Sequence, residues 1–469
     1  MTEQALAAAR AALGSEPAWV VGGAVRDALL GRPTADVDLV VSGDARTIAR
    51  TLARGAGGPA FELSGEFGAW RVIGPERRWQ VDVTPLQGSS LHEDLSRRDF
   101  TINAMAEPLA GGAVVDPHGG AQDLAARRLR MVSPASFDDD PLRVLRLARF
   151  ACELDLEPDA ETVAAAVQRA PRIVEVAPER VFAELKRVVA ADRVLDGLAL
   201  MDRLGLTPHV LPELSGLRGV EQNRYHHLDV HDHTLEVLAE TVALERDAAP
   251  VLGPELAEPI RAFLAQPLSD ELTRGEALRF GALLHDSAKP ETQARHEDGS
   301  ILGFPGHADL GAERARAALT RLRTSEKLRA HVALLARHHL GLGYLVHKAP
   351  LDRRTIHQYL VKTTPVEVDV SLLSIADRLA TRGRKADEAI ARHLAVARVV
   401  LPEALAYATF AAQPPLVRGD DLAREIGITP GPALGTLLGE LDEARFAGEI
   451  ATRDEAVALA RTLVRTTDA

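Results

Sequence analysis

The sequence lacks the residues that stabilise disulfide-rich and aromatic-rich folds. It has one cysteine among 469 residues, so no disulfide can form within the chain. Cys152 lies in the apolar stretch FACELDL, where we expect it to pack in a core in a reducing compartment. Aromatic residues make up only 4% of the chain, whereas Ala, Leu and Arg are abundant. This composition favours helix over sheet.

Long apolar runs are also missing. The first residues, MTEQALAAARAALG, suggest a short amphipathic helix without the apolar core and cleavage site of a secretion signal. We expect no later run to be long enough to span a bilayer. We therefore expect a cytoplasmic protein with no membrane partner.

The chain has no overall excess of positive charge. Its formal net charge is −12, which argues against a general nucleic-acid coat, because non-specific phosphate binding depends on clustered Lys and Arg. Solvated helix faces would account for many basic residues singly, but a local basic track remains. It consists of Arg127, Arg128, Arg130, Arg143, Arg146, Arg149, Arg180, Lys186 and Arg187.

The length and the pattern of apolar residues predict several domains. WVVGGAVRDALLG indicates a strand, a glycine turn and a helix, and TADVDLVV and WQVDVT indicate two more strands. After residue 130 helical patterns dominate. We predict a mostly α-helical α+β chain with a mixed-sheet head, a helical neck, a helical body, a histidine-rich domain and a helical tail, at residues 1–125, 126–190, 191–225, 226–385 and 386–469.

Three carboxylates in the predicted head indicate a metal site. Asp36 and Asp38 stand at positions i and i+2 of a strand, so both side chains lie on one face and could hold divalent cations. An exposed strand end explains an isolated D-x-D equally well. Asp82 in WQVDVT offers a third carboxylate. With Mg²⁺, such a set would activate an attacking 3′ hydroxyl and stabilise a departing pyrophosphate.

Two further segments of the head and neck suit a nucleotide. Gly22 and Gly23 open a helix after a strand, so backbone N–H groups can approach a triphosphate while Arg26 adds positive charge. In DDPLRVLRLARF, Asp140 can accept from the exocyclic amino group of cytosine or adenine, and Arg143 can donate to their ring acceptors. Guanine and uracil would leave Asp140 without a donor.

Four blocks carry a family resemblance. GGAVRD, DVDLV, RRDFTINAMA and DDPLRVLRLARF follow one another between residues 22 and 150, and in order and spacing they resemble the motifs of class II tRNA nucleotidyltransferases and bacterial poly(A) polymerases. The resemblance implies a polymerase-beta-like head, and it implies that the neck and tail bind the tRNA 3′ end and acceptor arm.

The resemblance also implies roles for individual residues. Asp36 and Asp38 would bind metal, and Gly23 and Arg26 would contact the triphosphate. The nucleotide-binding set would further include Gly22, Arg98, Asp140, Arg143, Arg146 and Arg149. Asp99 and Asn103 would order this region or contact the sugar. Arg146 and Arg149 follow Arg143 at three-residue steps on one helix and would meet base or phosphate; simple surface cations are the alternative.

One departure from the family pattern bears on which nucleotides are added. Full CCA-adding members have a flexible loop between the third carboxylate and RRDF, but here only PLQGSS lies between Thr84 and Leu91. Loss of this loop resembles the CC-adding specialists, which use CTP and leave the terminal A to a separate A-adding enzyme. Full CCA addition from CTP and ATP is the main alternative, followed by poly(A) polymerase or A-adding activity.

Ten of the 16 histidines fall between residues 226 and 339. HDHTLEV, LLHDSAK, GFPGHADLG, ARHHLG and SIADRL resemble the motifs of an HD-domain phosphohydrolase. The resemblance implies a divalent metal such as Mg²⁺, Mn²⁺ or Ni²⁺, held by His233, His285, Asp286 and Asp377, with His307 and His338 at a second position. Lys289 would contact phosphate. A vestigial, structural HD domain is the alternative.

Two other classes of function compete with an enzyme of two active sites. The chain could be a tRNA-binding protein whose pockets are remnants, or the HD unit could carry the main activity while the head presents RNA. The intact acidic residues at both predicted sites favour the two-site enzyme.

Overall fold

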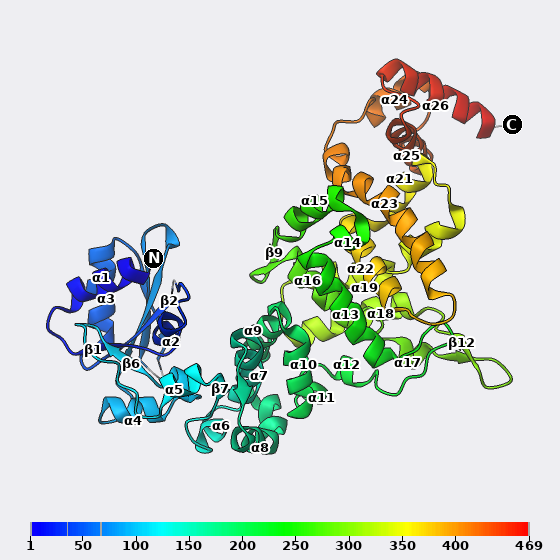
Figure 1. The fold of residues 1–469 in the computed structure, drawn as a ribbon. Coiled ribbons are helices and arrows are strands. Elements are labelled where there is room, and N and C mark those ends of the chain that lie inside the picture. Colours follow the sequence, from blue (N-terminus) through cyan, green and yellow to red (C-terminus); the bar gives the residue numbers. More distant parts are fainter. Residues whose placement is uncertain (1, 35, 66–67, 468–469) are drawn as a thin grey trace. The chain divides into compact units, whose positions relative to one another are not determined.

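The computed structural model describes residues 2–34, 36–65 and 68–467, and it divides into two compact units, Met1–Val210 and Leu211–Ala469 (Figure 1). The break falls inside the predicted helical body of residues 191–225. Helices α10 (Val194–Arg203) and α11 (Thr207–Val210) pack within the first unit, whereas α12 (Pro212–Ser215) packs on α16 (Arg274–Leu284) of the second. The fold class is the predicted one, with a mixed sheet near the N-terminus followed by helices.

A six-stranded mixed sheet forms the core of the head, in the order β3-β4-β5-β2-β1-β6. β2 and β5 are parallel, and the other neighbours are antiparallel. The sequence predicted β1, β2 and β5 but missed the other three, of which β3 and β6 lie at the sheet edges and β4 lies inside the sheet. The bounds are β1 Ala18–Val21, β2 Asp36–Val41, β3 Ala60–Ser64, β4 Ala69–Ile73, β5 Gln80–Pro85 and β6 Ala106–Pro108.

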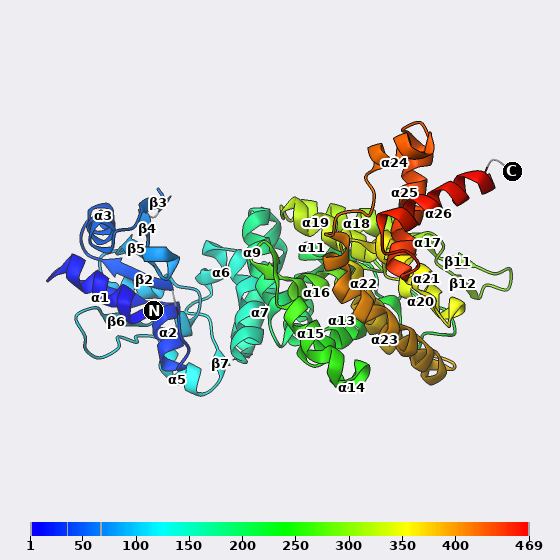
Figure 2. The same ribbon diagram turned by 90° about the horizontal axis from the view of Figure 1, so that it is seen from above.

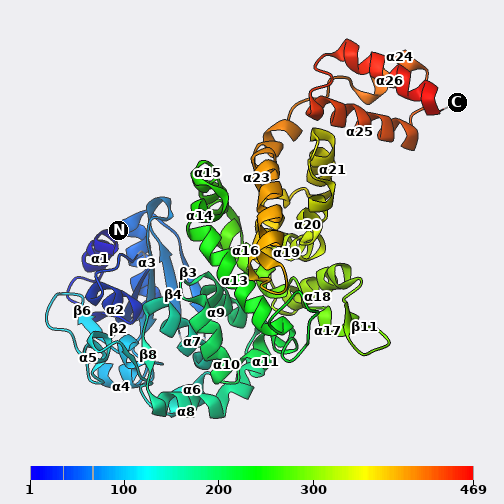
Figure 3. The ribbon, with the colours of Figure 1, turned by 45° about the vertical axis from the view of Figure 1, so that its right-hand side comes forward.

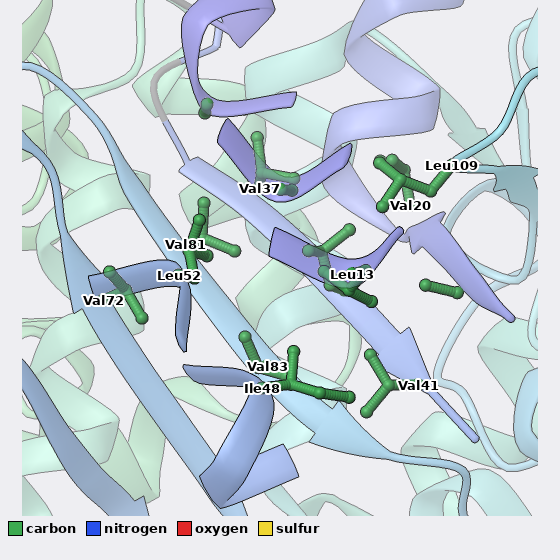
Figure 4. Packing of buried hydrophobic residues seen from close by; sticks show 14 of the residues in the cluster. Leu13, Val20, Val37, Val41, Ile48, Leu52, Val72, Val81, Val83 and Leu109 are labelled. Atoms are coloured by element: carbon green, nitrogen blue, oxygen red, sulfur yellow. The ribbon is translucent and has the colours of Figure 1, made fainter. Parts of the chain in front are cut away.

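One face of this sheet is buried under two helices, α1 (Thr2–Leu13) and α3 (Ala45–Ala56) (Figure 2). Val37, Leu39 and Val41 of β2 point into this layer and are almost fully buried. Figure 4 shows Val37 and Val41 among the apolar side chains of the cluster. Because successive side chains of a strand alternate between faces, Asp36 and Asp38 lie on the opposite face.

The neck is a group of helices in which α7 (Leu142–Leu154) packs against α9 (Pro178–Ala190) and α10. Cys152 of α7 is 4% exposed, and burial raises the pKa of its thiol to about 12. The predicted core role of Cys152 is therefore confirmed. The remaining elements of the first unit are α2 Gly23–Leu29, α4 Leu91–Ser96, α5 Gly120–Ala125, α6 Ala135–Asp139, α8 Ala160–Arg169, β7 Arg128–Leu129 and β8 Glu157–Pro158.

Five long helices form the centre of the second unit. α13 packs on α16 and α22, and α19 packs on α16 and α18. Their bounds are α13 Val230–Arg246, α16 Arg274–Leu284, α18 His307–Arg321, α19 Glu326–His338 and α22 Glu367–Ala380. The elements around them are α14 Ala249–Leu252, α15 Pro254–Leu264, α17 Lys289–Thr292, α20 Gly341–Leu345, α21 Arg353–Thr363, β9 Pro267–Ser269, β10 Leu272–Thr273, β11 Ala294–Arg295 and β12 Ile301–Gly303.

Helix α23 (Ala386–Ala411) corrects one expectation. By length and composition it is apolar enough to cross a membrane, contrary to the prediction that no run reaches that length. In the fold α23 packs against α22, and Val400, Leu401 and Ala404 are buried. Its apolar residues thus contribute to a protein core.

The last three helices, whose ribbons are labelled in Figure 3, share a buried apolar cluster of their own. They are α24 (Gly419–Ile426), α25 (Pro432–Ala447) and α26 (Arg453–Thr467). Leu422, Leu437 and Ala456 belong to the buried cluster between them. α25 also packs on α21 of the same unit.

Candidate active sites

The carboxylates predicted to hold metal in the head lie on adjacent strands. Asp38 of β2 is in direct register with Asp82 of the parallel strand β5. The carboxylate of Asp38 opens to the cleft, but the surrounding protein removes most of the bulk water near it. This desolvation, followed by the negative charges of Asp82 and Asp36, raises the pKa of Asp38 to about 6. A divalent cation would relieve this repulsion, so the site suits Mg²⁺.

Asp82 already has a partner in the structure. Its two carboxylate oxygens accept hydrogen bonds from Nε and Nη2 of Arg71, each at 2.7 Å. Arg71 lies on β4, a strand that the sequence did not reveal. The role of Asp82 as a third metal ligand stays a prediction, and each of its oxygens keeps a second lone pair for a cation while Arg71 remains bound.

The glycine turn brings backbone close to the carboxylates. Gly22 has φ 67°, in the left-handed region that favours glycine, and a Cβ there would lie 3.0 Å from Nη1 of Arg98 and 3.6 Å from Oδ2 of Asp38. Gly22 and Gly23 line a cleft of about 470 Å³ together with Asp36, Asp38 and Arg98. The positive φ and the close neighbours both disfavour a side chain at Gly22 and keep the backbone open to a ligand.

The RRDFTINA block positions the arginine of the turn. Asn103 Oδ1 accepts from Nη1 of Arg26 at 2.7 Å, and Asn103 Nδ2 donates to Asp99 Oδ1 at 3.0 Å. Burial alone would raise the pKa of Asp99, but Arg146 and Asn103 lower it to about 2. Asp99 is therefore an ionised anchor, which supports the ordering role expected for Asp99 and Asn103.

Asp140 and Arg143 line the same cleft, and both already have partners. Asp140 Oδ2 accepts from Nη2 of Arg180 at 2.7 Å, while Arg143 donates to the carbonyl oxygens of Ser136 at 3.1 Å and Arg97 at 2.9 Å. Their predicted pairing with a base stays a prediction. Sequence reasoning placed Arg180 only in the basic track, because its contact with Asp140 spans 40 residues.

Arg146 and Arg149 differ from ordinary surface cations. Arg146 Nε donates to Asp99 Oδ2 at 2.8 Å, and Arg149 Nη1 lies 2.9 Å from Glu184 Oε2. The Arg149 side chain is 5% exposed, lies over the ring of Phe150 and has its pKa lowered to about 10 by burial. Both arginines also line the cleft, so their predicted contact with nucleotide stays a prediction.

In the second unit, the structure brings together the four residues predicted to hold the first HD metal. His233 Nε2 of α13 lies 3.0 Å from Asp377 Oδ1 of α22, and His285 Nε2 lies 3.1 Å from Asp286 Oδ2. His233 Nε2 is also 3.9 Å from Asp286 Oδ2. The ligand atoms of His233, His285 and Asp286 lie within 4.8 Å of one another, as one cation would require.

A second group of ligand atoms shares Asp286. Its Oδ1 lies 3.5 Å from His307 Nε2 and 3.8 Å from His339 Nε2, and the two histidine nitrogens are 3.3 Å apart. Nδ1 of His307 lies 2.7 Å from the carbonyl of Phe304, and Nδ1 of His339 lies 2.6 Å from that of Ala336. These contacts assign the ring proton to Nδ1 and leave Nε2 for a metal.

His339 takes the place predicted for His338. In the parts of the chain that the structure describes, no group of ligand atoms with metal-binding spacing contains His338. His339 is 1% exposed, and burial lowers its pKa to about 4, whereas His338 is only half-buried. Consecutive residues at a helix end point about 100° apart, so only one of the pair can face the centre.

The position of His339 in place of His338 predicts different metal contents for variants of these two residues. His339→Ala should lower the affinity of the second metal position on the order of 100-fold, because it removes a ligand. His338→Ala should bind metal as the unmodified protein does. Titration with Mn²⁺, followed by elemental analysis of the dialysed proteins, measures both. Metal loss in His338→Ala alone would contradict the assignment of His339.

Comparisons with known proteins identify the domain families of this chain. Three family models match, described as "Poly A polymerase head domain" over residues 18–130, "Probable RNA and SrmB- binding site of polymerase A" over 155–217, and "HD domain" over 230–382. An A-adding tRNA nucleotidyltransferase of Deinococcus radiodurans is 38% identical over 94% of this chain and 94% of its own length. A CC-adding tRNA nucleotidyltransferase of Thermus thermophilus is 34% identical over 94% and 92%.

Solved structures show the same fold. The apo form of a CCA-adding enzyme has a TM-score of 0.63 at 20% identity, covering 99% of this chain and 93% of its own. A Thermotoga maritima CCA-adding enzyme complexed with tRNA has a TM-score of 0.61 at 20% identity, covering 98% and 95%. At this identity the likeness shows the fold alone.

Proposed function

This chain belongs to the family of class II tRNA nucleotidyltransferases and bacterial poly(A) polymerases, and from this we propose that it adds two cytidines to tRNA 3′ ends. CTP would be the substrate, and a separate enzyme would add the terminal adenosine. Since tRNA and CTP are cytoplasmic, the proposal places the protein in the cytoplasm.

The observation that carries the proposal is the short, tightly bonded connection between β5 and α4. Gln87 N donates to Asp94 Oδ1 at 3.0 Å, and Ser89 N donates to Glu93 Oε2 at 2.8 Å. Gly88 has φ 104°, which also favours this tight turn. Full CCA-adding relatives are thought to use a flexible loop here to reshape the pocket from CTP to ATP. Loss of this loop resembles the CC-adding specialists, so a pinned turn of this length supports a pocket that keeps its specificity for CTP.

The chain's own residues supply the rest of the proposed chemistry. Asp36 and Asp38, with Asp82, would hold Mg²⁺, which when bound activates the 3′ hydroxyl and stabilises the pyrophosphate. The turn at Gly22 and Gly23 would bring the triphosphate to the first backbone N–H groups of α2, because the N–H of Gly22 itself donates to the carbonyl of Met105 at 3.3 Å.

We assign base selection to the hydrogen-bonding groups of Asp140 and Arg143, which would pair with the base. Asp140 would accept from the amino group of cytosine, with Arg180 satisfying the carboxylate until the base arrives. Guanine or uracil would leave this acceptor unpaired, at a cost of about 1–3 kcal/mol.

Sequencing of extended tRNA ends tests the proposal. Purified protein is incubated with tRNA ending before the tail, after C or after CC, each with all four nucleoside triphosphates. We expect the first two substrates to end in CC and the third to remain unextended, with little U or G added. Efficient completion of the whole tail would instead establish a CCA-adding enzyme.

A-addition is the second candidate, because the relative at 38% identity carries that name. It predicts the opposite pattern, with adenosine added to tRNA ending in CC and no cytidine added to the shorter tRNAs. The same three substrates therefore separate the two specialists.

For the HD centre we propose a metal-dependent phosphohydrolase acting on phosphomonoesters or 2′,3′-cyclic phosphates, including damaged tRNA ends. The two ligand groups sharing Asp286 support it. Bound Mg²⁺, Mn²⁺ or Ni²⁺ would supply activated water. Lys289 Nζ lies 2.6 Å from Asp286 Oδ2, where its charge can also neutralise a phosphate. A vestigial domain would show no hydrolysis with any of these metals.

A further inference from the structure

A loop that the chemistry above does not use forms one wall of the HD centre. Gln222 Oε1 accepts from Lys289 Nζ at 2.7 Å, and the ring of His226 lies 5.1 Å from that of His233. Burial, together with the charge of Lys289, lowers the pKa of His226 to about 3. Gln222 and His226 therefore contact residues of the centre, and Tyr225 directly precedes the second of these contacts in the chain.

Between these two contacts the loop exposes an aromatic ring and a cation. Tyr225 is 48% exposed, although large aromatic side chains usually bury more of their surface. The guanidinium of Arg224 is 5.4 Å from the centre of the Tyr225 ring. Gln222, Arg224 and Tyr225 also line a cavity of about 610 Å³, together with the hairpin of β11 and β12. The ring thus stands beside open space.

A second segment is locked to this loop through backbone. Gly383 N donates to the carbonyl of Tyr225 at 3.0 Å, and a Cβ on Gly383 would lie 2.1 Å from that oxygen. Only glycine permits so close an approach. The contact brings Arg384 and Lys385 beside Tyr225. The hydrogen bond from Arg224 is the main cause that lowers the pKa of the tyrosine hydroxyl, and the charges of Arg384 and Lys385 lower it further.

Arg382 of this region lies 3.6 Å from Asp387 Oδ1, but its neighbours Arg384 and Lys385 differ. Residues 222–227 and 381–385 contain no acidic side chain, although the whole chain carries a net charge of −12. Arg384 and Lys385 are exposed, and among the described residues neither has an ion-pair partner. We call Arg224, Tyr225, Arg384 and Lys385 the basic rim.

We propose that the basic rim binds the last nucleotides of a single-stranded RNA, so that the HD centre acts on RNA 3′ ends in preference to free mononucleotides. An exposed tyrosine can stack on any base, and neighbouring cations can bind the phosphodiesters. In the reaction, water adds to the terminal phosphorus, the bond from phosphorus to the ribose oxygen breaks, and that oxygen leaves as a hydroxyl. The inference rests on the proposed phosphohydrolase function.

Hydrolysis of two matched substrates tests the preference. The full chain with Mn²⁺ is assayed on a six-nucleotide RNA with a 3′-phosphate and on cytidine 3′-monophosphate. Tyr225→Ala, and separately the pair Arg384→Gln and Lys385→Gln, should raise KM for the RNA about 10-fold and leave the mononucleotide reaction unchanged. Tyr225→Phe should restore the RNA reaction. Tyr344→Ala removes another exposed tyrosine of the same unit and should change neither.

Photocrosslinking gives a readout that needs no hydrolysis. An RNA with 5-iodouridine at its 3′ end, irradiated with the protein in EDTA, should crosslink to Tyr225 and lose this crosslink in Tyr225→Ala. Absence of any crosslink within 222–226 and 381–385 would overturn the inference, as would equal effects of the rim variants on both substrates. A crosslink at Tyr225 without hydrolysis of either substrate would support the rim and refute the phosphohydrolase.

Discussion

Replacement of Asp38 by Asn is expected to lower CMP incorporation about a thousandfold or more, which corresponds to about 4 kcal/mol of transition-state stabilisation. Asn keeps the shape of the side chain and removes the charge that would hold Mg²⁺. Asp38 is the carboxylate in register with Asp82 and on the same face as Asp36, so its charge lies at the centre of the acidic group. Incorporation of labelled CTP into tRNA ending before CCA measures the loss.

The same variant should not lose stability in the metal-free state. Burial and the charges of Asp82 and Asp36 raise the folded-state pKa of Asp38 to about 6, above its ordinary value of 3.8. Ionisation of Asp38 therefore lowers the free energy of unfolding as pH rises from 3.8 to about 6. At pH 7 a neutral Asn avoids this loss. We expect an unchanged or higher Tm at pH 7 in EDTA.

Asp44→Asn is the matched control, because Asp44 caps α3 in the same head by accepting from Thr47 N at 2.9 Å. Asn caps as well as Asp, so this variant should fold and incorporate CMP normally. Full activity of Asp38→Asn, or equal losses in the two variants, would contradict a metal-binding role of Asp38.

Replacement of Asp286 by Asn should abolish HD phosphohydrolase activity, with a fall of about a thousandfold, and leave CMP incorporation intact. Asp286 is the residue that both ligand groups share, and it is 1% exposed. Burial opposes its charge, but His285 and Lys289 hold its pKa well below the ordinary value. Loss of this carboxylate should therefore weaken both metal positions together, whereas the cleft of the first unit uses no residue beyond 210.

Metal analysis and the two activity assays on one preparation test this separation. Asp352→Asn serves as the control in the same unit, because Asp352 caps α21 by accepting from Thr355 N at 2.7 Å and Asn can replace it. Loss of both activities in Asp286→Asn, with an unchanged Tm, would refute independent sites. Unchanged hydrolysis would remove Asp286 from the metal centre.

Local sequence pattern was sufficient wherever a feature depends on one element. The alternation along β2 places Asp36 and Asp38 on one face, because strand side chains repeat every two residues. The two glycines after β1 similarly predicted a tight turn, and Gly22 does adopt the left-handed conformation that disfavours a side chain. The ordered His and Asp motifs also predicted that His233, His285, Asp286 and Asp377 would meet, and these four do converge.

Packing between distant elements decided the remaining features. Arg71 reaches Asp82 from a strand without a clear sequence signal, and Arg180 reaches Asp140 across 40 residues. His339 rather than His338 faces His307 and Asp286, because the rotation of α19 against its neighbours selects one of two adjacent rings. A linear pattern records direction along a single helix or strand, but which side chains meet is set by the register and rotation that minimise exposed apolar surface in three dimensions.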